Sequence, residues 1–419
     1  MKGRFISQVA SMVVNGLNRS TGIDLYRVLK AHWERKLVLR SLPAPEGFRN
    51  DGINLFFEAR TLSSISKTGR DLARKLSLAN IPFALVDTTA PWATRNLISG
   101  GESDAIGSMC ALTAPFRKSI ILGAQEQKLA SEYSMWHEVF YEFEDGLSKQ
   151  RPALFLNATR ACVFSDFCER AVRSEAPEKF RIVKIRYPFI FPALENDSDK
   201  QQVRKRFSIP QNAFAVFFNF SYESSIERKN PEAIIAAFGN AFHDDPAAIL
   251  VLKTTGGTKH ASDVARVCSA LSSFDIAERT VMIDRDLSET EVLSLTGAMD
   301  AYISLHRGEG LGLGMLEAMS LGVPVIATAF GGNTEFTWED NSFLVPFEMV
   351  PCPPGSIFAS YVSKWAEPNI EVASKHLSFV RNNPDEARKR AEKGLAFIRD
   401  FYSLENFRSD IQAFLSLQD

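Results

Sequence analysis

The fold of this chain follows from one stretch, Ala301-Tyr-Ile-Ser-Leu-His-Arg-Gly-Glu-Gly-Leu-Gly-Leu-Gly-Met-Leu-Glu-Ala-Met-Ser-Leu-Gly-Val-Pro-Val-Ile-Ala327. Its apolar strand ends at Leu305, a glycine-rich turn covers 308–312, and a helix runs to Ser320, a pattern that predicts one unit of a parallel sheet. Such sheets bind ligands beyond the carboxyl ends of their strands, where glycines admit a ligand and helix N–H groups attract anions. The stretch therefore predicts an anion-binding turn.

Two carboxylates flank this turn. Glu309 precedes the helix, and Glu317 follows eight residues later, about two helical turns further on. The pair can therefore contact two parts of one extended ligand. The plainer alternative is a tight turn with glycines for close packing and two solvent-facing carboxylates, and the residues alone leave both interpretations open.

The spacing of the glycines argues against one class of site. Gly308, Gly310, Gly312 and Gly314 do not form G-x-G-x-x-G and lie far from the first strand–helix–strand unit of the chain. A dinucleotide fingerprint is therefore disfavoured.

Outward from this stretch, apolar runs alternate with helical patterns in two series. The first series begins with strand 53–57, a helical pattern at 72–78 and strand 81–87, followed by predicted strands at 119–122, 139–143, 161–164 and 182–185. A proline-containing polar stretch, 187–210, reads as a linker. The second series predicts strands at 214–220, 248–253, 280–283, 301–305 and 324–327, with helices at 231–242, 262–271 and 289–297 between them.

These series predict an α/β protein with two sheet-containing domains. We expect a helical N-terminal segment over 1–50, a first domain over 51–200, a second over 205–395, and a C-terminal helix at about 400–419 that joins the first domain.

The bulk composition describes an ordinary soluble protein with a formal net charge of −2, which argues against a general nucleic-acid binder. No apolar run is long enough to span a membrane, and no signal-peptide pattern opens the chain. The cysteines show no CxxC pair and no metal-ligand spacing, so we expect reduced thiols in the cytoplasm and no metal site; they are Cys110, Cys162, Cys168, Cys268 and Cys352.

The first 50 residues are basic, with nine Lys and Arg against three Asp and Glu. Residues with helical apolar spacing, such as Phe5, Val9 and Met12, accompany these charges. The favoured interpretation is a solvated helix packed on the next domain. The alternative is an interfacial helix on anionic lipid, which would give peripheral contact with an inner membrane.

Several blocks of the second series resemble one enzyme family. The stretch 306–328 resembles the E-x7-E block of retaining glycosyltransferases with the GT-B fold, the family 4-like group also called group 1. Similar blocks occur in the family's order over roughly 214–370, namely Arg228-Lys-Asn-Pro-Glu-Ala233, Gly331-Gly-Asn-Thr-Glu-Phe336, Asn341-Ser-Phe-Leu-Val-Pro346 and Trp365-Ala-Glu-Pro368. The first half matches loosely, chiefly in its strand pattern and in Phe140-Tyr-Glu-Phe-Glu144.

The resemblance implies two Rossmann-like domains facing across a cleft, an acceptor domain and then a donor domain. It implies transfer of a hexose from a nucleotide-diphosphate sugar to a glycan or lipid-linked acceptor, with retention of configuration, in the synthesis of bacterial surface polysaccharide. It also implies no cofactor and no metal. A front-side substitution, in which the leaving phosphate takes the acceptor's proton, needs no nucleophile on the far face of the sugar.

The resemblance also implies residue roles. Glu317 would accept from the ribose hydroxyls and Glu309 from hydroxyls of the donor sugar, as carboxylates suit vicinal diols. Backbone amides near Gly310, Leu311 and Gly312 would meet the sugar and diphosphate. Lys229 aligns with the family's phosphate-binding lysine.

Other candidates are less specific. The family's usual phosphate-binding arginine is absent, because Ser221 or Tyr222 occupies its region. Arg228 or Lys253 is the expected substitute. The alternative for each of these two residues is an ordinary surface charge on a loop. In the family's order Asp284 and Arg285 fall where the nucleoside base is held, so the resemblance implies that they belong to the base pocket or to an ordinary loop.

Two histidines and one glycine complete the candidates. His306 lies beside the donor motif, and His137 lies near the position of an acceptor-side residue in related enzymes. Each histidine is either a catalytic candidate or a structural residue whose ring nitrogens are hydrogen bonded within the protein. Gly69, with Arg70, is expected to open the first helix and approach the diphosphate, or else simply to begin that helix.

Three rival functions remain open from sequence. A GT-B-like sugar-nucleotide epimerase would act without an acceptor, a non-catalytic scaffold would keep only the fold, and an NAD-dependent dehydrogenase is disfavoured by the missing fingerprint.

Overall fold

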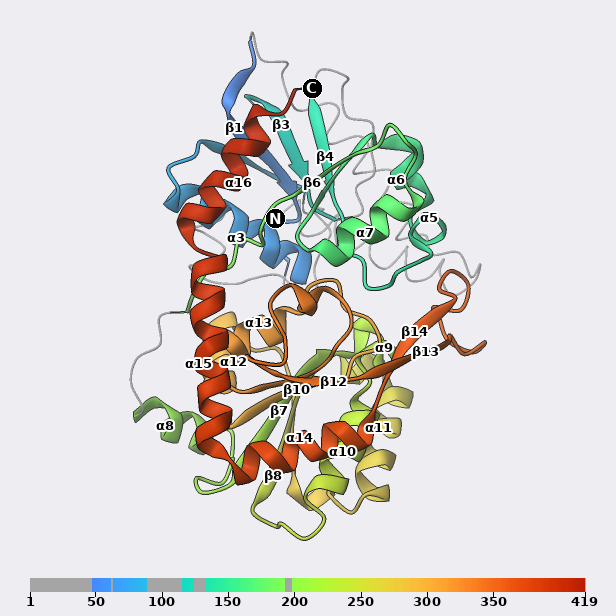
Figure 1. The fold of residues 1–419 in the computed structure, drawn as a ribbon, viewed down its shortest axis with the longest axis vertical. Coiled ribbons are helices and arrows are strands. Elements are labelled where there is room, and N and C mark those ends of the chain that lie inside the picture. The colour runs from blue at the N-terminus through green and yellow to red at the C-terminus, as the bar shows by residue number, and fades with distance from the viewer. Residues whose placement is uncertain (1–46, 62, 89–114, 124–132, 193–197, 419) are drawn as a thin grey trace, which may run out of the picture.

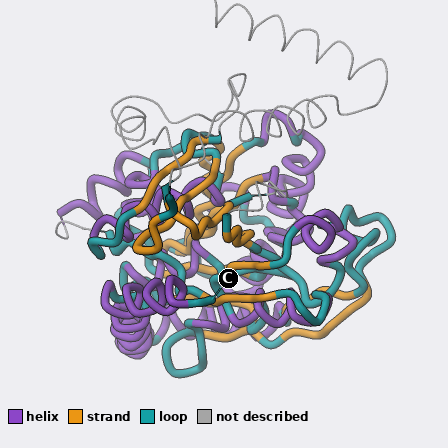
Figure 2. The backbone as a smooth tube through the Cα atoms, turned by 90° about the horizontal axis from the view of Figure 1, so that it is seen from above, coloured by secondary structure: helices purple, strands orange, loops and turns teal. Residues whose placement is uncertain are grey.

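The computed structural model describes residues 47–61, 63–88, 115–123, 133–192 and 198–418, so the basic N-terminal segment expected over 1–50 lies almost wholly outside the described residues. The described residues form two α/β halves, one above the other in Figure 1. Seen from above, helices surround the strands of both sheets (Figure 2). Two parallel six-stranded sheets confirm the predicted fold class.

The N-terminal half is built on a sheet in the order β2-β1-β3-β4-β5-β6. All five neighbouring pairs run parallel. Its strands are β1 (Arg49–Phe57), β2 (Phe83–Asp87), β3 (Phe116–Ile121), β4 (Ser134–Glu138), β5 (Arg160–Val163) and β6 (Arg181–Lys184). Its described helices are α3 (Ser64–Leu78), α5 (Leu147–Gln150), α6 (Pro152–Asn157) and α7 (Asp166–Glu175).

One predicted strand of this half is wrong. The strand expected at 139–143 is a connection, and the fourth strand is the preceding segment β4. The connection is apolar because Tyr141 and Phe143 are buried between the two halves, where the Phe143 ring packs 5.0 Å from that of Phe358. Burial in an interdomain contact and burial in a sheet give the same apolar pattern.

The C-terminal half has a second parallel sheet in the order β12-β11-β10-β7-β8-β9. Its strands are β7 (Phe214–Ser221), β8 (Ala248–Thr255), β9 (Thr280–Asp284), β10 (Ala301–Ser304), β11 (Val325–Thr328) and β12 (Phe343–Val345). Its α-helices are α8 (Ser198–Arg206), α9 (Ile226–Lys229), α10 (Pro231–Ala241), α11 (Ala261–Ser273), α12 (Glu289–Gly297), α13 (Leu313–Ser320) and α14 (Ile370–Asn382). Four short 3-10 turns are η1 (Tyr222–Ser224), η2 (Gly257–Lys259), η3 (Ala277–Arg279) and η4 (Gly332–Glu335).

The strand order of this sheet determines where a ligand can bind. The chain starts in the middle at β7, moves outward through β8 and β9, and returns to place β10 on the other side of β7. Open parallel sheets bind ligands at such a reversal, beyond the carboxyl ends of the strands. The turn after β10 is the glycine-rich stretch around Glu309.

The C-terminal helices cross from one half to the other. Helix α15 (Pro384–Phe401) runs along the lower half and α16 (Leu404–Ser416) lies against the upper one (Figure 1). There the Phe414 ring packs edge-on at 5.4 Å from that of Trp136, and Lys118 donates to the carbonyl of Leu417 at 2.7 Å. The end of the chain thus fastens the two halves together.

A hairpin that the sequence did not predict makes a second link. Strands β13 (Phe347–Pro351) and β14 (Lys364–Pro368) pair antiparallel. The segment between them shares an apolar cluster with the N-terminal half. The backbone approach is close, since a Cβ on Gly146 would lie 1.9 Å from the carbonyl oxygen of Tyr361. Only glycine fits there, and its φ of 87° is also one that glycine tolerates.

None of the helices in the described ranges is long and apolar enough to cross a membrane.

Candidate functional site

The glycine-rich turn packs tightly against the loop after β11. The amide of Gly332 donates to the carbonyl of Glu309 at 2.6 Å, and a Cβ on Gly332 would lie 1.8 Å from the carbonyl oxygen of Gly310. Gly312 precedes α13 with a φ of 92°, in the left-handed region. These glycines therefore hold two loops in backbone contact, which fixes the direction of Glu309.

Glu309 is held by two cations from the opposite loop. The ammonium of Lys229 lies 2.6 Å from its Oε2, and Nη1 of Arg228 lies 3.5 Å from the same oxygen. Arg228 also donates to the carbonyl of Gly308 at 2.9 Å. Burial would raise the pKa of Glu309, but Lys229 and Arg228 outweigh it and lower the pKa to about 2. Glu309 is thus an anion at any physiological pH.

Glu317 has a different environment. It lies on α13 with 8% of its surface exposed, and no hydrogen-bond donor reaches its carboxylate from the described residues. The nearest cation is Lys67, at 3.9 Å. Burial raises the pKa of Glu317 to about 7, opposed by Lys67 and assisted by the carboxylates of Glu289 and Asp71. A buried carboxylate that accepts no hydrogen bond from the protein is suited to accept hydrogen bonds from a ligand.

The turn also touches the N-terminal half. The carbonyl of Gly310 accepts from the hydroxyl of Ser165, the N-cap of α7, at 2.8 Å. The Leu311 side chain is buried in the main core. The position of the backbone at 310–312 therefore depends on contacts from both halves.

The structure places His306 and His137 in the protein interior. Both ring nitrogens of His306 are hydrogen bonded, Nδ1 with the hydroxyl of Ser304 at 3.0 Å and Nε2 with the carbonyl of Phe330 at 2.8 Å. His137 lies near the carboxyl end of β4, where burial and the charge of Arg151 lower its pKa to about 4. Its Nδ1 has no hydrogen-bond partner within the described part of the chain. Both imidazoles are accordingly neutral at pH 7.

Lys253, Asp284 and Arg285 lie at or just beyond the ends of β8 and β9. Asp284 accepts from the hydroxyl of Thr254 at 3.0 Å and from the amide of Gly257 at 3.4 Å. The Arg285 guanidinium lies 5.5 Å from the centre of the Phe207 ring. In the described residues none of these three side chains has a contact with Glu309 or Glu317.

Gly69 does not open its helix, which corrects the expectation from sequence. Helix α3 begins at Ser64 with Ser63 as its N-cap, so Gly69 lies in the second turn. A Cβ there would approach the Phe57 ring to 2.4 Å, and Arg70 donates to the carbonyls of Ala59 and Thr61. A small residue at 69 lets α3 pack on β1.

Lys67 is the site residue that sequence reasoning missed. Its ammonium lies 2.7 Å from Asp71, 2.5 Å from Glu289 and 3.9 Å from Glu317, and so joins α3 to α12 and α13. The i,i+4 spacing of Lys67 and Asp71 was visible in the sequence, but their partners are more than two hundred residues away.

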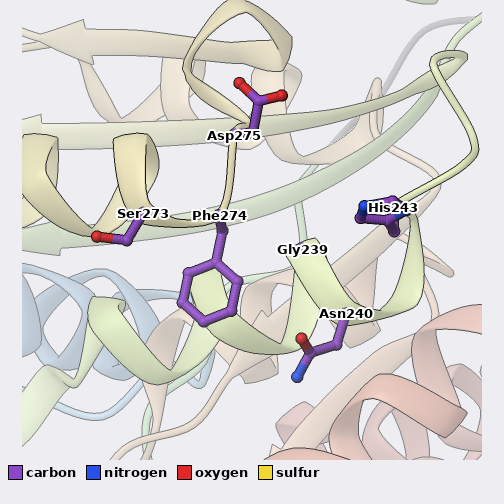
Figure 3. Close-up of a pocket in the computed structure, with 6 residues that line it drawn as sticks. All are labelled: Gly239, Asn240, His243, Ser273, Phe274 and Asp275. Atoms are coloured by element: carbon purple, nitrogen blue, oxygen red, sulfur yellow. The ribbon is translucent and has the colours of Figure 1, made fainter.

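A separate hollow of about 410 Å³ lies between α10 and the end of α11 (Figure 3). It is lined by Gly239, Asn240, His243, Ser273, Phe274 and Asp275. None of the predicted site residues contributes to it.

Comparison with known proteins finds similarity in the segment that contains the glycine-rich turn. Residues 218–351 match the family model described as glycosyl transferases group 1. D-inositol 3-phosphate glycosyltransferase 1 of Catenulispora acidiphila is 27% identical over 167 residues, which are 39% of this chain and 38% of that protein. The chain thus aligns with well under half the length of this relative.

Solved structures resemble the chain over most of its length. Anabaena HepE, solved in complex with UDP and glucose, has a TM-score of 0.61 at 14% identity and covers 87% of this chain and 99% of its own. Sucrose-phosphate synthase from Thermosynechococcus elongatus has a TM-score of 0.59 at 15% identity, with 87% and 98% covered. A glycosyltransferase from Rickettsia africae has a TM-score of 0.61 at 14% identity, with 88% and 98% covered. The chain therefore has the GT-B fold, and its residues 218–351 are similar to the group 1 glycosyltransferases.

Proposed function

We propose that this protein is a retaining, metal-independent glycosyltransferase that moves a hexose from a nucleotide-diphosphate sugar to a glycan or lipid-linked acceptor. The observation that carries the proposal is the ionised Glu309 held by Lys229 and Arg228 at the reversal of the C-terminal sheet. This cluster lies inside the segment that matches the group 1 family. HepE, of the same fold, was solved with UDP-glucose bound.

The cations suit the chemistry of the leaving group. Negative charge grows on the departing diphosphate as the glycosidic bond breaks, and fixed cations in a site shielded from water stabilise that charge. Lys229 and Arg228 are positioned by Glu309 before any substrate arrives. In the proposed reaction the bond from the anomeric carbon to the diphosphate oxygen breaks, the bond to the acceptor oxygen forms on the same face, and the acceptor's proton passes to the departing diphosphate.

The two carboxylates take separate roles in this proposal. Glu309, always ionised, accepts from hydroxyls of the donor sugar while it orients Lys229. Glu317, buried and free of hydrogen-bond donors from the described residues, accepts from the ribose hydroxyls. Lys253, Asp284 and Arg285 stand as candidates for the base end of the donor, and Gly310 to Gly312 for the diphosphate. His137 and His306 act, if at all, as neutral imidazoles.

We place the reaction in the cytoplasm, in assembly of a bacterial surface polysaccharide, with peripheral membrane contact through the basic N-terminus.

The proposal is tested by offering a panel of UDP-, GDP- and ADP-hexoses to the purified full chain with and without a mixture of glycan and lipid-linked acceptors. Mass spectrometry should show an acceptor one hexose heavier, and NMR of the product should show the donor's anomeric configuration. Glu309→Ala should abolish transfer, whereas Glu348→Gln, at an exposed carboxylate on β13, should not. EDTA should leave the rate unchanged. Conversion of the donor without any acceptor would instead indicate an epimerase, and an inverted product would refute retention.

A further inference from the structure

Glu317 lies where two halves of the protein meet, and its charge depends on both. The carboxylate belongs to α13 of the C-terminal half, and the cation nearest to it among the described residues belongs to α3 of the N-terminal half. Glu317 is nine-tenths buried, and among the residues that the structure describes none donates a hydrogen bond to its carboxylate. A carboxylate in this state is costly to keep ionised unless a positive charge stands near it.

Lys67 supplies that positive charge without forming a hydrogen bond to the oxygens of Glu317. Two other carboxylates hold its ammonium at short range, Asp71 at 2.7 Å and Glu289 at 2.5 Å, while Glu317 stays at 3.9 Å. At this longer distance the attraction persists but no hydrogen bond forms. The oxygens of Glu317 therefore remain open to hydroxyl donors from a ligand.

The anchors of Lys67 come from both halves. Asp71 lies one turn further along α3, with its side chain 1% exposed, and Glu289 is the first residue of α12. Glu289 is held in place because α12 begins with a capping box between Ser288 and Glu291. The position of the ammonium is thus set by α3 and α12 together, before any ligand binds.

We propose that Lys67 is a positioning residue of the ribose subsite, contributed across the domain boundary. Its ammonium, anchored by Asp71 and Glu289, favours the ionised form of the Glu317 carboxylate and leaves its oxygens free to accept from the vicinal diol of a nucleoside diphosphate. The subsite is complete only while α3 packs against α12 and α13, so recognition of the diol is coupled to closure of the two halves. This inference rests on the proposed function, since it assigns a partner to the carboxylate that binds the donor's ribose.

The test compares diol recognition in matched variants. Calorimetry measures the affinity of the full chain for UDP, GDP and ADP, and then for the 2′-deoxy form of the diphosphate that binds most tightly. Wild type should prefer the ribonucleotide by about tenfold or more, since a hydrogen bond to a charged group is lost. Lys67→Met and the polar but uncharged Lys67→Gln should reduce this preference to about twofold or less. Lys67→Arg, which keeps the charge, should restore most of it.

The matched control is Lys184→Met. Lys184 also joins the halves, through Asp166 of α7 and Glu335 at 2.8 Å, but it does not touch the carboxylates of the proposed ribose subsite. This variant should keep the wild-type preference. Circular dichroism confirms folding, and Lys67→Gln serves if Lys67→Met does not fold.

The outcomes separate the two claims. If Lys67→Met and Lys67→Gln keep the full preference for the ribonucleotide, Lys67 has no part in diol recognition and the inference is overturned. An equal loss in Lys184→Met overturns it too, because closure alone would then explain the effect. If wild type binds none of the three diphosphates, the proposed function fails and the inference falls with it.

Discussion

The ammonium of Lys229 lies 2.6 Å from Oε2 of Glu309, and this contact joins the end of α9 to the glycine-rich turn eighty residues later. The two side chains are 20% and 14% exposed, so the pair is shielded from bulk water while remaining reachable. In the proposed function, this one contact orients a cation toward the diphosphate and a carboxylate toward the donor sugar.

Breaking this pair should impair both activity and stability. Lys229→Met removes the closest cation to a buried carboxylate, so we expect the transfer rate to fall by about a hundredfold or more. We expect the free energy of unfolding to fall by about 3 kcal/mol as well, because Arg228 is then the one cation paired with Glu309 among the described residues. Urea unfolding and the rate with the identified donor measure the two effects.

Lys259→Met is the control for that substitution. Lys259 pairs with Glu223 at 2.8 Å, and both side chains are 46% exposed. Its loss should change the free energy of unfolding by less than about 1 kcal/mol. Equal effects of the two substitutions would contradict the role assigned to Lys229.

Glu317 should make stability and donor binding respond to pH in opposite directions. Its pKa in the folded state is about 7, above the ordinary value of 4.5, because burial dominates over Lys67 and the carboxylates of Asp71 and Glu289 add to the shift. The folded protein therefore holds this proton more tightly than the unfolded chain does. The stability it provides is full below pH 4.5 and is lost as the pH rises through 7.

Glu317→Gln should consequently be more stable than wild type at pH 8.5, by at most about 3 kcal/mol, and about equal at pH 4. The same variant should bind the donor nucleotide poorly at every pH, whereas wild type should lose affinity as the pH falls below 7. Urea unfolding and calorimetry across this range check both trends. A variant less stable than wild type at pH 8.5 would show that Lys67 outweighs burial.

Gly69→Ala should affect packing and leave nucleotide affinity alone. The new Cβ would lie 2.4 Å from the fully buried Phe57 ring, so α3 must shift from β1. We expect a loss of about 2 kcal/mol in the free energy of unfolding, despite the better helix propensity of alanine. Gly355→Ala is the control, since nothing lies within 4 Å of its added Cβ. A drop in nucleotide affinity for folded Gly69→Ala would instead favour the diphosphate contact expected from sequence.

His137 should make the protein sensitive to acid. Burial and Arg151 lower its pKa to about 4, whereas an unfolded histidine titrates near 6.5. Its contribution to stability is present above pH 6.5 and is lost as the pH falls toward 4, by about 3 kcal/mol over that range. His137→Gln cannot titrate, so its unfolding free energy should fall less between pH 7 and 4.5. Parallel pH profiles of the two proteins would show that His137 is not the group responsible.

The sequence predicted the parts of this protein that depend on local pattern. The helices α10 and α12 and the strands β7 to β11 of the C-terminal sheet lie within a few residues of their expected positions, because apolar periodicity, Pro231 and the cap at Ser288 act over short distances. The sixth strand, β12, was not predicted. The turn around Glu309 was visible for the same reason. Its two carboxylates and glycines lie within a dozen residues of one another.

What the sequence missed depends on contacts between distant segments. The apolar run 139–143 predicts a strand, but Tyr141 and Phe143 are instead buried against the segment that joins β13 to β14. A local sequence pattern shows that a run is apolar but does not show which part of the protein packs against it.

The residues of the candidate site likewise fall into those that the sequence indicated and those that only the tertiary structure brought together. The sequence by itself placed Glu309 and Glu317 on one turn and the helix that follows it, and Lys229 joined them only through the family resemblance. The strand order of the folded sheet brings Lys229 to Glu309. Only the tertiary structure decided the charge states of the two carboxylates, since Arg228 lowers the pKa of Glu309 from across the turn and burial raises that of Glu317. It alone brought Lys67 to Glu317, because electrostatic attraction and burial depend on distance in space, and these residues meet only when the two halves pack together.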